Sequence, residues 1–225
     1  MSSTQRSKQR SASGGTAARA PSSGYALLKR ALDVGLALVG LVLSSPVWVG
    51  AALVILLTDG PPMFFHQDRL GRGGKVFKLK KFRTMRRGEN PIADLPPSRD
   101  PRLTRVGRLL RATALDELPA LLHILKGDMS FVGPKPLAPV VNDPPDPDNG
   151  VMAKDLPRFH LRVTVRPGLT GLAQVHAAKN ARYRHKFRYD ALYVDRMGLA
   201  LDLKILALSF LRTFRGAWER VGGPG

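Results

Sequence analysis

The chain has 225 residues, of which 44% are hydrophobic, and this composition excludes a chain that is disordered throughout. It contains no cysteine, so disulfide bonds and cysteine-based metal sites are excluded as well. The formal net charge of +19 favours an anionic partner, and nucleic acid, anionic lipid and a phosphorylated substrate all fit this requirement.

The N-terminal part of the chain divides into a polar tail and an apolar segment. Residues 1–24 are rich in Ser, Ala, Gly, Thr and Arg, which predicts a disordered basic tail. A secretory signal is not expected, because the apolar run starts too late and is too long. Residues 25–58 are predicted to be the membrane segment. The run from Val34 to Leu57 carries no charge, and roughly 20 helical residues suffice to cross about 30 Å of hydrocarbon.

Two features of this segment favour a re-entrant helix–break–helix over a single crossing. Pro46 lacks an amide hydrogen and clashes with the preceding turn, and Ser44 and Ser45 can bond the carbonyl groups that it frees. Both flanks are basic, with Lys29 before the segment and a strongly basic stretch from Arg69 onward, and basic flanks stay in the cytoplasm. A single-pass helix and the buried helix of a soluble core are the alternatives.

The rest of the chain predicts a small cytosolic domain, 59–214, of mixed but mostly helical structure with short strands and amphipathic interfacial helices. The predicted elements in chain order are strands at 63–71 and 75–85, helices at 102–112 and 115–127, a Pro- and Asp-rich loop at 138–150, an amphipathic helix at 199–214 and a flexible tail at 215–225.

The most informative stretch is RATALDELPALLHILKGDMSFVGPKP, residues 111–136. Its leucines recur on one helix face, and Pro119 is tolerated only in a first turn, so we expect the helix to begin near Asp116 or Glu117. A carboxylate there meets the positive helix end, which favours its ionised form, and an ionised Asp is a competent nucleophile at phosphorus. An adjacent carboxylate can hold Mg²⁺ together with substrate phosphates. Plain helix capping is the alternative.

The chain resembles the bacterial sugar transferase family, the monotopic phosphoglycosyl transferases. The resemblance runs from about Lys29 to Phe214. It rests on five motifs in the family's order: KRALDVGLALVGLVLSSP, FFHQDRLGRGGKVFKLKKFRTM, DPRLTRVGRLLRATALDELPALLHILKGDMSFVGPKPL, VRPGLTGLAQV and YDALYVDRMGLALDLKIL.

The resemblance implies transfer of a phosphosugar from a UDP-sugar to polyprenyl (undecaprenyl) phosphate, with release of UMP. This would be the first membrane step of bacterial exopolysaccharide, O-antigen, capsule or glycoprotein assembly. It implies a covalent phosphosugar on Asp116, Mg²⁺ at Glu117, and the break of a re-entrant membrane helix at Ser45 and Pro46. It also implies the bacterial inner membrane, with the catalytic domain on the cytoplasmic face beside anionic lipid.

Further substrate-binding candidates come from the same match. Arg111 matches an active-site arginine whose guanidinium suits a diphosphate, and Asp190 matches an aspartate near the active site. Ordinary structural roles are the alternatives, including a salt bridge of Asp190 with Arg188. Lys135 lies in a matching motif as well. The other candidates come from the residues themselves: the charges of Lys80, Arg83, Arg102 and Arg105 could hold phosphate or lipid head groups, and Arg166, Gly168, Thr170 and Gln174 lie in a turn-rich segment where a backbone could approach a substrate.

The sequence departs from the family's pattern at two places, and both bear on the substrate. Lys135 stands where arginine is commoner, which keeps the charge but loses the bidentate fork. His176, Ala177 and Ala178 stand where Asn-Gly-Arg is usual, and this leaves the sugar preference open.

Two other classes of protein compete with the enzyme. A membrane-anchored nucleic-acid-binding protein would explain the charge, but no nucleic-acid-binding motif is visible, so we expect no specific nucleic-acid partner. A scaffold that has lost catalysis conflicts with the intact Asp116–Glu117 pair. The sequence leaves the glycan pathway and the oligomeric state open.

Overall fold

The computed structural model describes residues 22–86, 102–143, 146–178 and 181–214. All but the last three residues of the predicted tail 1–24 lie outside these ranges, as does the whole of the tail 215–225. The described chain is mostly helical with six short strands in three two-stranded sheets, which confirms the mixed, mostly helical prediction.

The elements are α1 Ser23–Asp59, β1 Phe64–Leu70, β2 Val76–Phe82, α2 Arg105–Ala112, α3 Ala120–Lys126, β3 Ser130–Val132, β4 Val140–Asp143, β5 Asp146–Met152, α4 Phe159–Arg162, β6 Gly168–Thr170, α5 Leu172–His176, α6 Tyr183–Arg196 and α7 Leu199–Phe214, with single 3-10 turns at Arg72–Gly74, Leu115–Glu117 and Ala153–Asp155.

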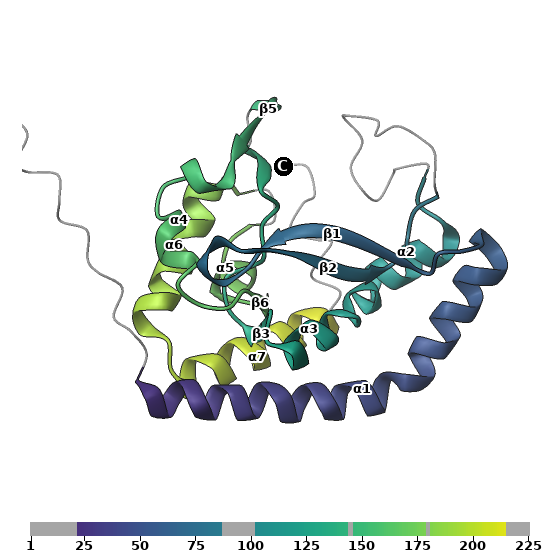
Figure 1. Cartoon of the computed structure of the whole chain (residues 1–225), viewed down its shortest axis with the longest axis horizontal. Helices are drawn as coiled ribbons and strands as arrows, with labels where there is room; N and C mark the ends of the chain where they lie inside the picture. Colours follow the sequence, from purple (N-terminus) through teal and green to yellow (C-terminus); the bar gives the residue numbers. More distant parts are fainter. Residues whose placement is uncertain (1–21, 87–101, 144–145, 179–180, 215–225) are drawn as a thin grey trace, which may run out of the picture.

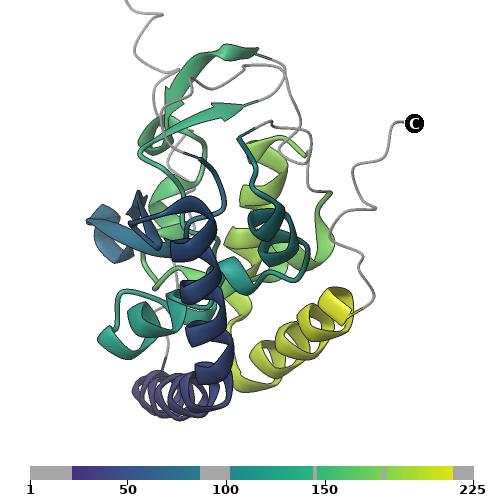
Figure 2. The same ribbon diagram turned by 90° about the vertical axis from the view of Figure 1, so that its right-hand side faces the viewer.

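Helix α1 is one continuous helix of 37 residues that contains Pro46. It is bent, so that its first part lies along the base of the molecule and its last part rises towards β1 (Figures 1 and 2). Pro46 cannot donate to the carbonyl of Val42, and Ser45 Oγ donates to that carbonyl instead at 2.8 Å. The structure therefore has a bend where the sequence predicted a break, because helical bonding continues on both sides of the proline.

Most of the apolar surface of α1 faces outward. Val42, Leu43 and Leu57 are 72%, 75% and 77% exposed, although each is a large aliphatic residue. Among the described helices, α1 is the one that is long and apolar enough to cross a membrane. An apolar surface of this extent suits lipid better than water.

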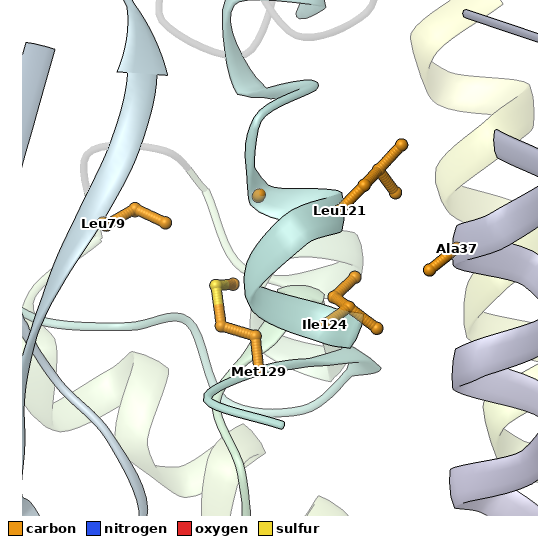
Figure 3. Packing of buried hydrophobic residues seen from close by; sticks show 6 residues of the cluster. Ala37, Leu79, Leu121, Ile124 and Met129 are labelled. Atoms are coloured by element: carbon orange, nitrogen blue, oxygen red, sulfur yellow. The ribbon is translucent and has the colours of Figure 1, made fainter. Parts of the chain in front are cut away.

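The opposite side of α1 belongs to the core of the domain. Figure 3 shows α3 between α1 and β2, with Leu121 directed towards Ala37 of α1 and Met129 on the side of Leu79. Ala37 and Ile124 have no exposed surface. Farther along α1, Ile55 is also fully buried, in a second cluster with residues of β2 and α2. Helix α3, which follows the predicted catalytic pair in the chain, is thus packed directly on α1.

The two predicted strands after α1 form an antiparallel hairpin, as expected. β1 pairs with β2 from Phe64↔Phe82 to Leu70↔Val76. The turn uses Gly73 and Gly74 at φ +69° and +73°, a conformation that glycine adopts without a steric penalty.

The Pro- and Asp-rich segment 138–150 is not the loop that its composition predicted. It contains β4 and the first part of β5, which pair antiparallel as Val140↔Met152 and Val141↔Val151. These strands project at the top of the view in Figure 1. β-Branched residues at the paired positions favour strands, and they outweigh the turn signals between them.

A short parallel pair, β3 with β6, brings two glycine-rich motifs together. A Cβ atom on Gly168 would lie 2.1 Å from the nitrogen of Gly133, and one on Gly171 would lie 2.1 Å from its carbonyl oxygen. Only glycine allows this approach. The contact fixes the segment before Lys135 beside the segment that follows Arg166.

Candidate active site

The adjacent carboxylates lie in a 3-10 turn between α2 and α3. Ala114, just before the turn, has a positive φ of 56°, which redirects the chain out of α2. Helix α3 begins at Ala120, with Pro119 as its N-cap, so the predicted start near Asp116 was three or four residues too early. The pair therefore precedes the helix and is not part of its first turn.

The environment of Asp116 differs from the prediction. Burial raises the pKa of Asp116, and the negative charge of Glu117 raises it further, whereas Lys81 and Arg111 oppose the change. The expected bias towards the ionised form is therefore wrong, because the helix N-terminus lies farther along the chain. A carboxylate with a raised pKa is more basic, and this makes it a stronger nucleophile once it is ionised.

Glu117 lies in a strongly basic environment. Lys81 Nζ is 2.5 Å from Glu117 Oε1, and both side chains are partly exposed, at 22% and 33%. Burial alone would raise the pKa of Glu117, but the charges of Lys81, Lys135 and Arg69 outweigh burial and hold this pKa below its usual value. Two adjacent carboxyl groups thus have pKa values displaced in opposite directions, a pattern typical of active sites.

The carboxylate pair fits a magnesium ion only if the ion shares other ligands. The described residues contain no group of three or more His, Cys, Asp or Glu side chains that could hold a metal. Mg²⁺ is commonly bound through one or two carboxylates together with substrate phosphates and water. Glu117 and Asp116 can supply that carboxylate share, and a diphosphate would have to supply oxygen ligands as well.

Two neighbouring pockets share part of their walls. The smaller is lined by Glu117 and Lys81, and the larger, of about 290 Å³, lies among α5, α6 and α7. Both are lined by Arg69, Lys135 and Pro136. The predicted residues that line one or both pockets are Glu117, Lys135, Gly168, Gln174 and Asp190.

A buried ion pair forms one wall of the larger pocket. Arg162 Nη2 lies 3.1 Å from Asp190 Oδ2 and donates to the carbonyl of Lys135 at 2.6 Å. Burial raises the pKa of Asp190, and the Arg162 charge opposes this change. The partner of Asp190 is therefore Arg162, which lies 28 positions before it. The sequence suggested Arg188 as the partner because Arg188 is only two positions from Asp190 in the chain.

The remaining predicted residues are placed around the site or away from it. Arg111 lies by Asp116, and its Nε donates to Thr84 Oγ1 at 3.0 Å. Arg83 donates to the carbonyls of Asp59 and Gly60 at the end of α1.

Three further candidates have structural contacts. Arg166 Nε donates to the carbonyl of Gly127, which ends α3. Lys80 Nζ lies 5.0 Å from the centre of the Phe64 ring, on the strand face opposite to Lys81. Thr170 is buried beside the pockets, in the β3–β6 pair.

The last two candidates, Arg102 and Arg105, lie at the start of the α2 region. The carbonyl of Arg102 accepts from the amide of Arg86 at 2.8 Å, and Arg105 is the first, exposed residue of α2. Neither residue lines the two pockets.

Several pocket residues were missed by sequence reasoning. Each carries a polar or charged group, and they come from segments far apart in the chain. They are Arg69, Arg162, Tyr183, Lys186 and Arg212. A charge count along the sequence could mark the basic stretches that contain them but could not single them out.

Comparisons with known proteins show the family of the chain. A sequence model of the bacterial sugar transferase family matches residues 24–216. The chain therefore belongs to the bacterial sugar transferase family, whose members are enzymes, and this confirms the resemblance noted from the motifs.

Three curated relatives illustrate the family. The chain is 40% identical over 186 residues to the UDP-glucose:undecaprenyl-phosphate glucose-1-phosphate transferase of Caulobacter vibrioides. The aligned region covers 80% of the chain and 67% of that relative. It is 36% identical to the UDP-N-acetylgalactosamine-undecaprenyl-phosphate N-acetylgalactosaminephosphotransferase of Aeromonas hydrophila, over 83% of the chain and 43% of the relative. It is 36% identical to an exopolysaccharide production protein of Rhizobium leguminosarum, over 80% of the chain and 92% of the relative. The chain thus spans less than half of the Aeromonas relative.

Proposed function

We propose that this protein transfers a sugar phosphate from a UDP-sugar to undecaprenyl phosphate and releases UMP, as an initiating step of exopolysaccharide or related glycan assembly. The observation that carries the proposal is the pair of adjacent carboxyl groups with oppositely displaced pKa values, of which Glu117 lines a basic pocket. The names of the relatives support the donor and the acceptor.

The proposed reaction has two chemical steps. The carboxylate of Asp116 attacks the sugar-bearing phosphorus, and the bond from that phosphorus to the bridging oxygen breaks, so that its electrons leave with UMP. An oxygen of undecaprenyl phosphate then attacks the same phosphorus and releases the Asp116 carboxylate. The burial that raises the pKa of Asp116 makes this carboxylate a better nucleophile, and ping-pong kinetics are expected.

Glu117 and the basic residues around the carboxylate pair have separate roles in the proposed reaction. Glu117, kept ionised by Lys81, would hold Mg²⁺ together with the diphosphate, and the ion would neutralise the charge that develops on the leaving phosphate. Arg111 lies beside Asp116 and offsets its negative charge. Lys135 faces both pockets, where it can contact the diphosphate.

The same proposal places the chain on the cytoplasmic face of the bacterial inner membrane. The bend in α1 and the exposed aliphatic surface on it support a re-entrant path, in which the segment enters and leaves on one side. The basic flanks of the segment favour the cytoplasmic side and contact with anionic lipid.

The proposal is tested by intact-mass analysis of purified protein incubated with Mg²⁺ and one UDP-sugar, without lipid. UDP-glucose and UDP-N-acetylgalactosamine are the first donors to try. Wild type is expected to gain the mass of one phosphosugar, and Asp116→Asn to gain none and to lose turnover. Glu117→Gln is expected to show a weaker Mg²⁺ dependence and a lower rate.

The stability of Asp116→Asn separates lost chemistry from lost folding. The pKa of Asp116 is higher in the folded protein than in the unfolded chain, so ionisation destabilises the fold as pH rises above the unfolded value. Removing this group should therefore leave the melting temperature at pH 7.5 unchanged or raised. Near wild-type turnover by Asp116→Asn would refute the covalent mechanism and favour direct attack by the lipid phosphate.

A further inference from the structure

Arg69 occupies the junction between the two pockets and has no role in the scheme above. Its side chain lines the larger pocket and also the smaller pocket that contains Glu117. It leaves strand β1 on the same face as Gln67, two positions earlier, and its Nη2 donates to Gln67 Oε1 at 2.5 Å. Lys135 lines the same two pockets, so two cations meet at the junction.

The hydrogen bonding of Arg69 is incomplete. Its Nε is buried and has no hydrogen-bond partner among the described residues. Burial lowers the pKa of Arg69, whereas the nearby Tyr183 and Glu117 oppose the change. A buried donor without a partner is unfavourable to the folded state, and the second cation at the junction, Lys135, adds to that cost. The fold pairs Nη2 with Gln67 and places the Arg69 charge near Glu117, but it leaves Nε without an acceptor, and an anionic ligand would supply one.

We propose that Arg69 is a substrate-binding residue that holds a phosphate of the nucleotide sugar's diphosphate at the pocket junction, with Lys135 as its companion. The proposal rests on the function proposed above. A planar guanidinium presents Nε and one Nη as a fork that matches two phosphate oxygens, a geometry that a lysine ammonium does not offer. Glu117 lines the smaller of the two pockets, so a diphosphate at the junction also lies close to the carboxylate pair.

The larger pocket indicates which substrate brings the phosphate. Gln174 Oε1 and Asp190 Oδ1 are buried acceptors without hydrogen-bond partners among the described residues, and both residues line this pocket. A sugar or nucleoside can donate hydroxyl or imide hydrogens to such acceptors. A polyprenyl chain would leave them unpaired, which disfavours the lipid phosphate as the group that Arg69 holds.

The test compares Arg69→Met and Arg69→Lys with Arg72→Met, a matched control on the same hairpin. Arg72 is exposed, donates to the carbonyl of Thr164 at 3.1 Å and lines neither pocket. The KM values for UDP-sugar and for polyprenyl phosphate are measured separately. Binding of UDP without lipid is followed by calorimetry, and thermal stability is measured in the same detergent.

Arg69→Met is expected to raise the KM for UDP-sugar and the Kd for UDP by about 10- to 100-fold, the usual weight of a charged hydrogen bond. The KM for polyprenyl phosphate should be retained, and the thermal stability should stay close to that of wild type, because the loss of the hydrogen bond to Gln67 is offset by the removal of an unpaired buried donor. Arg69→Lys should be intermediate, since it restores the charge without the fork. Arg72→Met should bind UDP like wild type.

Three results would overturn the proposal. One is UDP binding by Arg69→Met at wild-type strength. Another is a rise in the KM for polyprenyl phosphate alone, which would assign Arg69 to the lipid. The third is a loss of thermal stability in Arg69→Met that matches its loss of binding, which would make the role structural. Failure of the proposed function itself is distinct, because it would appear in wild type as the absence of a phosphosugar adduct.

Discussion

The contact between Lys81 and Glu117 offers a direct test of how the site is kept ionised. Lys81→Met removes an ammonium group that lies 2.5 Å from the carboxylate. Two unit charges about 4 Å apart interact by about 1 kcal/mol in water and about 4 kcal/mol in a protein-like dielectric. Because both side chains are partly exposed, we take about 1–2 kcal/mol, towards the lower end of this range.

The sign of the effect follows from the charge. Lys81 lowers the pKa of both Asp116 and Glu117, so its removal raises both pKa values and both carboxylates take up a proton at higher pH. The acid limb of the pH profile for phosphosugar adduct formation should move to higher pH. The estimated free energy corresponds to a roughly tenfold loss of rate on that limb, relative to the plateau at pH 8.

The neighbouring lysine provides a control within the same strand. Lys80 has the same charge but lies over the Phe64 ring on the opposite face of the hairpin. Lys80→Met should therefore leave the acid limb where it is in wild type. If Lys81→Met also left the limb unmoved, the reasoning that Lys81 keeps the carboxylate pair ionised would be wrong.

Two further predictions concern the membrane segment and the core. Single cysteines placed at Ser22 and at Asp59 should both be protected from an impermeant reagent in intact cells. Pro46→Leu should make the cysteine at position 59 accessible from outside. Labelling of only one of the two cysteines in a chain that keeps Pro46 would indicate a single crossing. Ile124→Ala should lower the free energy of unfolding by about 2–5 kcal/mol, because Ile124 has no exposed surface. Leu122→Ala, on the exposed side of α3, should cost about 1 kcal/mol or less, and an equal loss in the two variants would refute the packing argument.

Local patterns in the sequence were sufficient for several elements. The hairpin β1–β2 follows from apolar residues around a glycine turn, and α7 from its apolar stripe, and both occur where they were predicted. The start of α3 was misplaced because the left-handed conformation of Ala114 leaves no signal in the sequence. The strands β4 and β5 were missed because proline and aspartate are turn signals that paired valines can overcome.

The candidate site was predictable only in its centre. Asp116 and Glu117 are adjacent in the sequence and carry a motif, so they could be found without a structure. Arg162 reaches Asp190 and the carbonyl of Lys135 across 28 and 27 positions, and Arg69 of β1 lines the same pocket as Glu117. Contacts of this kind depend on how the elements pack, and a single sequence does not encode them in any local pattern.

The way α1 joins the domain means that the membrane segment is not an interchangeable tether. Asp33 of α1 accepts hydrogen bonds from Ser130 and from the amide of Phe131, and Arg30 donates to the carbonyls that end α3. Ala37 of α1 also packs in the buried cluster that contains Leu121 and Ile124 of α3. A fragment cut after Asp59, or a chimera with a foreign anchor, would leave these groups without partners. A water-soluble version of this enzyme should therefore keep the inner face of α1 unchanged. Only the apolar side chains on its outer face should be replaced by polar ones.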